Sequence, residues 1–333
     1  MIAFIASMAM RWARIVGIAC AGLCFSLASG SALALVFNGT LYYTVFSGAP
    51  NVFKINYSYD ETTTTFTLGA PTVVGTTNGA DGIIFLPNGN LLIGGQGANH
   101  VTEMTPAGVI VTTQALTSAS FHETLANDGS VVYTSSFGGP LQTVNIPIGT
   151  GATPTTITGG DSGITQVAFG DEGTAFYVDG GPNGFGNLGL INIATGVTTR
   201  LYTSVQPAHG LIYDPFTDLI TMFGAGHTGT MNDVTGGNLL TSATAFTCDF
   251  DQGAVDGFGH ALVAGCGGIT FIDYHLSGDI TNPNFFTTQF GFGAIDDVAP
   301  LTGAGSNPAP EPGTLLLLAA GIAGLAAARR RLH

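Results

Sequence analysis

The chain is short of charge, and of positive charge above all. Only 8% of its 333 residues are charged, and 7 Lys and Arg stand against 21 Asp and Glu. Five of the basic residues lie near the ends, at Arg11, Arg14 and Arg329–Arg331, so the long region between them has only Lys54 and Arg200 as cations. Such a region repels phosphate backbones and anionic lipid headgroups, although its acidity also serves simple solubility. The composition therefore argues against nucleic acid as a partner and leaves cations and uncharged molecules as candidate ligands.

Helical periodicity is absent between residues 35 and 303. Short apolar runs recur there instead, separated by Gly, Asn, Asp and Pro, and the chain holds 50 Gly in total. Glycine adopts the positive φ angles of tight turns, while β-branched and aromatic residues suit pleated strands. The pattern predicts an all-β domain over residues 35–303.

A repeat runs through this domain. Two apolar strands flank a turn in five successive units, and the turns are separated by 40, 44, 44 and 42 residues. The five turns lie at Gly89, Gly129, Gly173, Thr217 and Gly259. A period of about 40–45 residues with about four strands per unit is typical of β-propeller blades.

The ends of the domain complete the repeat. One more period leads to an opening strand near residues 294–299, after which no further strands follow. The segments 41–46, 52–57 and 64–68 form a strand set that has no opening strand before it. Pairing the two ends completes a sixth blade and closes the ring, which removes exposed sheet edges. We expect six blades, with seven as the alternative.

The repeat length and strand pattern resemble six-bladed propellers of the NHL and lactonase-like kind. In such propellers the opening strand of each blade lines a central channel. The residues at these positions are Asp81, His122, Gln166, His209, Asp251 and the pair Asp296 and Asp297. Carboxylates and imidazoles on one axis could hold a divalent cation, with calcium as a candidate and zinc also tolerated. A polar, water-filled channel is the alternative. No catalytic signature accompanies these residues, which favours a binding protein over an enzyme.

The N-terminal residues 1–34 have the pattern of a secretory signal peptide. Arg11 and Arg14 precede the apolar stretch 15–27, and Ala32-Leu33-Ala34 supplies a small-residue cleavage site. A membrane anchor is the alternative, but the apolar run is short. The pattern predicts export through a translocon.

Two of the 4 cysteines would remain after removal of the signal, Cys248 and Cys266. They lie nine residues on either side of Gly257, and pairing is the default in an oxidising compartment. We expect a structural disulfide between them.

The C-terminal residues resemble a PEP-CTERM sorting tail. A flexible linker over residues 304–313 ends in Pro310-Glu311-Pro312, and it is followed by an apolar run over 314–328. Residues 329–333 form a basic tail that holds Arg329, Arg330 and Arg331. The run would make about 22 Å of helix, short for a stable membrane span, and the arginines would stay cytoplasmic. The resemblance implies recognition by an exosortase-type protease; a permanent anchor is the alternative.

Two functional hypotheses follow. In the first, an exported propeller is held at the membrane only transiently and then acts as a binding or structural module at the cell surface or in the extracellular matrix, with a polysaccharide or surface protein as partner. In the second, the channel residues hold a metal for lactonase-like hydrolysis.

Overall fold

The structure, a computed structural model, describes residues 36–299 except 137–138, 151–153, 158–160, 162, 182–184, 244 and 247–249. The chain forms two compact units. In the first (Met1–Phe37, Asp60–Thr65 and Pro308–His333), the described residues are 36, 37 and the turn 60–65, where the Thr62 N–H donates to Asp60 Oδ1 at 2.9 Å. The second unit, Asn38–Tyr59 and Phe66–Asn307, holds the propeller. Residues 1–34 and 304–333 lie outside the described residues, so the signal peptide and the C-terminal helix remain predictions, and the described range holds no helix that could span a membrane.

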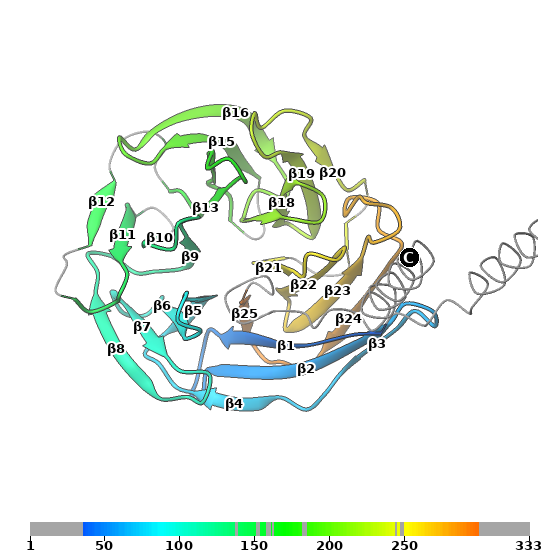
Figure 1. Ribbon diagram of the computed structural model, residues 1–333, viewed down its shortest axis with the longest axis horizontal. Coiled ribbons are helices and arrows are strands. Elements are labelled where there is room, and N and C mark those ends of the chain that lie inside the picture. Colours follow the sequence, from blue (N-terminus) through cyan, green and yellow to red (C-terminus); the bar gives the residue numbers. More distant parts are fainter. Residues whose placement is uncertain are drawn as a thin grey trace, which may run out of the picture. The chain divides into compact units, whose positions relative to one another are not determined.

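Six antiparallel sheets surround a central axis as the blades of a propeller (Figure 1). The predicted all-β fold and the count of six blades are confirmed. Five of the blades consist of four consecutive strands each, running from the axis to the periphery. The first comprises β5 (Ala80–Phe85), β6 (Leu91–Gly95), β7 (His100–Met104) and β8 (Ile110–Ala115). The second comprises β9 (His122–Leu125), β10 (Val131–Ser135), β11 (Leu141–Asn145) and β12 (Thr155–Ile157).

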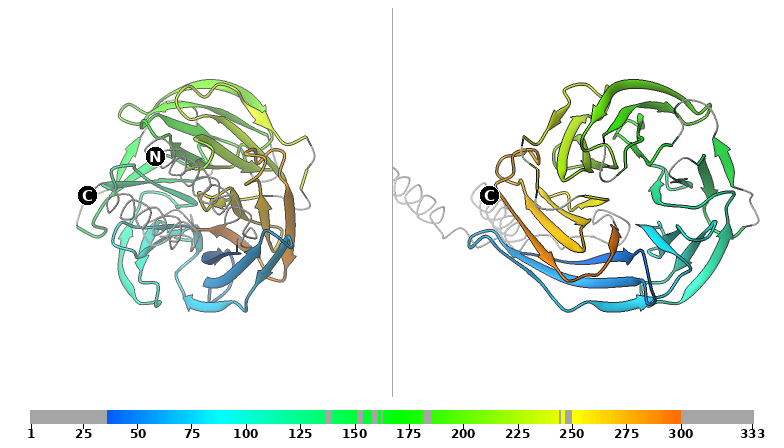
Figure 2. Two further views of the ribbon diagram at one scale, coloured as in Figure 1. Left: turned by 45° about the vertical axis from the view of Figure 1, so that its right-hand side comes forward. Right: turned by 180° about the vertical axis from the view of Figure 1, so that it is seen from behind.

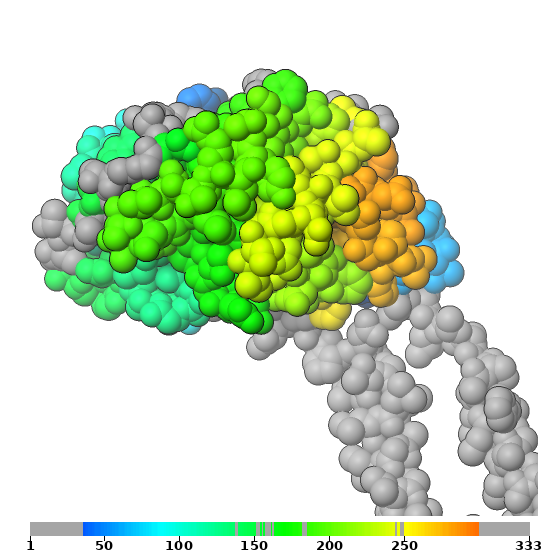
Figure 3. All heavy atoms as spheres, turned by 90° about the horizontal axis from the view of Figure 1, so that it is seen from above, coloured from blue at the N-terminus to red at the C-terminus, as the bar shows by residue number. Residues whose placement is uncertain are grey.

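The next three blades repeat this order around the ring. The third comprises β13 (Gln166–Phe169), β14 (Ala175–Val178), β15 (Gly186–Asn192) and β16 (Val197–Val205). The fourth comprises β17 (Gly210–Asp214), β18 (Leu219–Gly224), β19 (His227–Asn232) and β20 (Leu240–Thr241). The fifth comprises β21 (Gly253–Val255), β22 (His260–Gly265), β23 (Gly268–Asp273) and β24 (Phe285–Phe290). Figure 3 shows these three blades following one another along the side of the ring, from green to orange.

The sixth blade joins the two ends of the domain, as predicted. Its strands are β1 (Val36–Val45), β2 (Val52–Asp60), β3 (Thr65–Leu68), β4 (Thr72–Gly75) and β25 (Ile295–Val298). The C-terminal β25 is the inner strand and pairs with β1 through Tyr43↔Val298 and Val45↔Ile295. Figure 2 shows this junction from behind, where orange β25 lies beside the blue strands. The short β4, which pairs with β2, was not anticipated from the sequence.

Three of the five turns that defined the sequence repeat share one geometry. In the first three blades the N–H of Gly89, Gly129 or Gly173 donates to the carbonyl three residues earlier, at 2.8–3.0 Å. These glycines have φ of 81°, 70° and 82°, a region that favours residues without a Cβ. The fourth blade places Asp218 at φ 60° instead, one residue beyond the expected turn centre. The regular spacing in the sequence is thus the spacing of a turn that needs positive φ.

The hydrophobic core lies between neighbouring blades. Each of the buried clusters draws side chains from two adjacent sheets; one combines Phe176 and Leu188 of the third blade with Ile220 and Met222 of the fourth. Each large apolar side chain buried in this way stabilises the fold by about 1.5–3 kcal/mol. Packing of this kind repeats around the ring, so the inner strands are held rigidly around the axis.

Candidate metal centre

Histidine and carboxylate side chains meet on the axis of the ring, three from the inner strands β5, β9 and β25 and two from the residues just before β17 and β21. Two groups of ligand-type atoms form there, each with all its atoms within 4.8 Å of one another. One group is His122, His209 and Asp251, and the other is Asp81, His122 and Asp297. His122 belongs to both, so the two groups form one continuous cluster.

Asp251 bridges the two imidazoles. Its Oδ1 lies 2.5 Å from Nε2 of His209 and 3.3 Å from Nε2 of His122. The two rings meet edge to face, with centroids 4.8 Å apart. Burial alone would raise the pKa of Asp251, but the neighbouring His209 and His122 outweigh it and hold this pKa below its usual range. Asp251 is therefore the carboxylate that stays ionised.

Backbone carbonyls fix how both imidazoles face the cluster. Nδ1 of His122 lies 2.8 Å from the Thr165 carbonyl, and Nδ1 of His209 lies 2.7 Å from the Gly180 carbonyl. Since a carbonyl only accepts hydrogen bonds, Nδ1 carries the proton in each ring. At 2.5 Å from ionised Asp251 Oδ1, Nε2 of His209 must also donate a proton, and only when that proton is lost would the Nε2 lone pair point into the cluster as in metal-bound histidines.

Three aspartates supply oxygen atoms that lack hydrogen-bond donors. Among the described residues, Oδ2 of Asp81, Oδ2 of Asp296 and both carboxylate oxygens of Asp297 have no hydrogen-bond donor while these groups are ionised; when protonated, Asp81 can share a proton with Asp296 and Asp297. Burial, followed by repulsion from Asp251, raises the pKa of Asp296 to about 8. Burial and the surrounding carboxylates also raise the pKa of Asp81 and of Asp297 well above the ordinary range. A buried polar atom without a partner costs about 1–3 kcal/mol, so these oxygens are suited to a bound cation.

Two β-bulges place these aspartates on the axis. Between β1 and β25 the register shifts so that Asp296 and Asp297 both lie opposite Thr44. A second shift occurs between Ala80 and Ile83 of β5, at Asp81. Bulges re-aim side chains that strict alternation would send to opposite faces of the sheet.

Thr44 ties the two bulged strands together. Its hydroxyl donates to the Asp81 carbonyl at 2.6 Å and accepts from the Asp297 N–H at 3.1 Å. Thr44 is fully buried on β1, the strand contributed by the N-terminal end of the domain. Closing the ring therefore also assembles the cluster.

Glu123 belongs to the same region, although sequence reasoning missed it. It is 1% exposed, accepts a hydrogen bond from the Ser120 hydroxyl, and has no donor at Oε2 among the described residues. Its carboxyl lies against Gly82 and Gly94, where a Cβ would clash with its oxygens. Burial raises its pKa to about 8, against the effect of the Ser120 bond. In the sequence, only these two glycines in the adjoining strands could have indicated that Glu123 is buried here.

Gln166 differs from the other channel residues predicted from sequence. Its Oε1 accepts the Leu211 N–H at 2.6 Å, so this amide links the third and fourth blades. It belongs to neither ligand group. Of the predicted disulfide, Cys248 lies outside the described residues, so the pairing with Cys266 stays a prediction.

The fold and site together define a six-bladed β-propeller with a histidine and carboxylate cluster on its axis. Its destination is indicated by residues 308–331, which match the PEP-CTERM protein-sorting motif. Export and processing by an exosortase follow from that motif. A comparison with curated proteins finds no match.

Solved structures share the fold at low sequence identity. A propeller in a nidogen/laminin complex is 10% identical, with a TM-score of 0.56 over 79% of this chain and 98% of that chain. A catalytically inactive virginiamycin B lyase from Staphylococcus aureus with quinupristin is 11% identical, with a TM-score of 0.50 over 77% of this chain and 89% of that chain. At such identity the likeness shows the fold alone.

Proposed function

We propose that this protein is a metal-binding module of the cell surface, delivered there by its sorting tail and built around one divalent ion on the propeller axis. One observation carries the proposal. Two histidines whose Nδ1 protons are held by backbone carbonyls direct Nε2 into a group of buried carboxyls, where both approach Asp251 Oδ1 and His122 Nε2 lies 3.6 Å from Asp297 Oδ2, an oxygen with no hydrogen bond among the described residues. An arrangement of that kind costs stability unless a cation compensates it.

The donor set favours a transition metal over calcium. Calcium takes six to eight oxygen ligands, whereas imidazole nitrogen suits zinc, iron, nickel and copper, and carboxylates suit manganese. Two imidazoles and the carboxylates of Asp81, Asp251 and Asp297 offer a mixed nitrogen and oxygen shell. Zinc and manganese fit this shell, and the ion would neutralise the charge that the carboxylates concentrate on the axis.

The molecular role that we infer is binding at the cell surface or in the extracellular matrix, where a polysaccharide or a surface protein is the expected partner. The sorting motif supports the destination. A rigid ring whose ends are closed by pairing of β1 and β25 supports a long-lived module outside the cell.

Calorimetric titration of the full chain tests the metal site. After treatment with EDTA, we expect one Zn²⁺ or Mn²⁺ per chain, bound more tightly than Ca²⁺. Asp251→Asn and His209→Gln should weaken binding by more than the ~10- to 100-fold typical of losing a hydrogen-bond partner of a ligand. Because the pKa of Asp296 lies at about 8, uptake should release protons, and affinity should rise between pH 6 and pH 8.

Matched controls separate ligand loss from general effects. Asp128→Asn removes an exposed carboxylate and His100→Gln removes an imidazole on β7, and neither should change the metal affinity. Unaltered binding in Asp251→Asn, or no stoichiometric metal in the wild type, would contradict the proposal.

A metal-dependent hydrolase is the second candidate. Asp251 is 20% exposed while His122 and His209 are 2% and 1% exposed, so the cluster has one accessible side. Catalytic metal sites keep an open position for water or substrate. The test is hydrolysis of a simple lactone such as γ-butyrolactone. Activity that requires added Zn²⁺ or Mn²⁺ and disappears in His209→Gln would support the hydrolase. Stoichiometric metal without such activity would support the binding function and not the hydrolase.

A further inference from the structure

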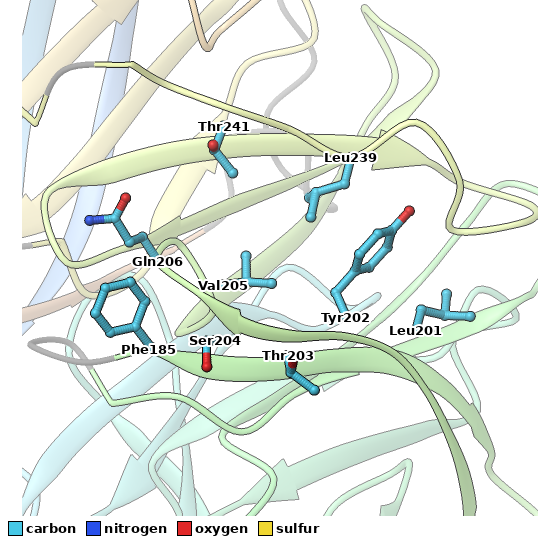
Figure 4. Close-up of a pocket in the computed structure, with 9 residues that line it drawn as sticks. All are labelled: Phe185, Leu201, Tyr202, Thr203, Ser204, Val205, Gln206, Leu239 and Thr241. Atoms are coloured by element: carbon cyan, nitrogen blue, oxygen red, sulfur yellow. The ribbon is translucent and has the colours of Figure 1, made fainter.

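A cavity lies between the outer strands of the third and fourth blades. It has a volume of about 470 Å³ and is lined by Phe185, by the end of β16 with the residues that follow it, and by residues at β20. In Figure 4, Phe185 lies on one side of Val205 and Tyr202 lies on the other. The volume falls within the range typical of small-molecule sites.

The lining of this cavity combines aromatic rings with neutral hydrogen-bonding groups. Phe185 and Tyr202 supply the rings, and Thr203, Ser204, Gln206 and Thr241 supply hydroxyls and an amide. Not one of the described residues that line it is charged. Within the described part of the chain, these hydroxyl and amide side chains have no hydrogen-bond partner. They are therefore available to a ligand.

The backbone is strained at the centre of this lining. Ser204 has φ 56°, a conformation that non-glycine residues rarely adopt. The register between β15 and β16 shifts on both sides of the pair Leu188↔Tyr202, as in a β-bulge. Without these irregularities, Thr203 and Ser204 would alternate across the sheet. Strain of this kind costs about 1–3 kcal/mol and clusters at ligand sites.

We propose that this cavity binds a neutral saccharide. A sugar ring has an apolar C–H face, which stacks on an aromatic side chain, and a rim of hydroxyls, which pair with hydroxyl and amide groups. Phe185 is 64% exposed, so it offers its ring to such a face from solvent. An anionic sugar is disfavoured because the lining offers no cation and the chain is strongly acidic. The site is separate from the axial cluster and does not depend on a metal.

Saturation-transfer difference NMR and calorimetry on the full chain test the proposal. The probes are the neutral tetrasaccharides maltotetraose, cellotetraose and chitotetraose, with tetragalacturonate as the anionic counterpart. At least one neutral probe should bind, with equal affinity before and after EDTA treatment, and tetragalacturonate should not. Phe185→Ala should weaken binding by about tenfold or more, because the stacking surface is lost.

Ser204→Gly separates a role of the Ser204 hydroxyl in binding from a role in stability. Glycine tolerates the local φ, so the variant should keep or raise its unfolding midpoint while its affinity for the saccharide falls. Ala225→Gly, at φ 48° in another turn, should leave the affinity unchanged, and Phe290→Ala removes a ring that is 58% exposed on β24 with no effect on binding.

Three results would each overturn the inference. They are the absence of binding by all neutral probes, preference for tetragalacturonate, and unchanged affinity in Phe185→Ala. Since none of these readouts involves metal, they are independent of the outcome at the propeller axis.

Discussion

Asp81, Glu123 and Asp297 are buried carboxyl groups, exposed by only 2%, 1% and 0%. Charged groups at such depth are stable only when they are paired or when their pKa shifts. The acidic excess visible in the composition is therefore not confined to the surface. Part of it is concentrated on the axis, where burial raises the pKa of these carboxyls.

Glu123→Gln should make the metal-free protein more stable at high pH. In the folded protein the pKa of Glu123 is about 8, against an ordinary value of 4.5. Between these values the folded state holds a proton that the unfolded chain has lost, so stability falls as the pH rises. Glu123→Gln has no ionisable carboxyl at this position, so it does not lose stability in this way as the pH rises. It should match the wild type at pH 5 and exceed it at pH 9 by on the order of 3 kcal/mol.

Urea unfolding in EDTA at both pH values measures this difference. Glu172→Gln, which changes an exposed carboxylate, serves as the control and should follow the wild type throughout. A Glu123→Gln curve that parallels the wild type from pH 5 to pH 9 would show that this carboxyl ionises normally.

At the scale of elements, the sixth blade is the one whose strands come from both ends of the domain. Its outer part packs on the fifth blade through Tyr59 of β2. The Tyr59 hydroxyl donates to Asp273 Oδ2 at 2.6 Å, and its ring lies 4.5 Å from that of Phe271. Phe66 of β3 stacks on Phe271 at the same separation. These contacts fasten N-terminal strands to a blade formed some 200 residues later.

Tyr59→Phe should destabilise the ring by about 1–3 kcal/mol, because Asp273 Oδ2 keeps its burial and loses its donor. Chemical denaturation measures the change. Tyr57→Phe on the same strand is the control, since the Tyr57 hydroxyl has no hydrogen bond to another described residue. Equal stability of the two variants would mean that the Tyr59 hydroxyl contributes nothing to closure.

For the whole molecule, charge and sorting are connected. The sorting motif spans residues 308–331, which include all three arginines of the C-terminal cluster. Cleavage at Pro310-Glu311-Pro312 would discard this positive charge. The protein left outside the cell would then be a ring with many carboxylates and very few cations.

Intact-mass measurement tests this processing. Protein recovered from outside the cell should lack Arg329–Arg331, whereas Glu311→Ala should retain them and remain with the membrane fraction. Glu172→Ala, a carboxylate change in the ring, should be processed normally. An intact tail on extracellular protein would instead support a permanent anchor or release by another route.

Local patterns allowed the architecture to be predicted from the sequence. The turn geometry at Gly89, Gly129 and Gly173 recurs because each blade reverses its chain in the same way, so the period could be read directly. Five of the channel residues form the two ligand groups because they open their blades. Glu123 was missed because strand alternation directs it away from His122, and only the glycines of the preceding blade, Gly82 and Gly94, make room for it.

By itself the sequence determined the all-β class, the six-blade repeat, the closure by both ends and the sorting tail, since each depends on local pattern or on order along the chain. Only the tertiary structure decided which atoms meet. The register between strands determines the bulges at Asp81 and at Asp296–Asp297. It also determines the hydrogen bond by which Gln166 accepts the Leu211 N–H. The cavity at Phe185 and Ser204 arises from packing between blades. Register and packing depend on partners distant in the chain, so no local pattern specifies them.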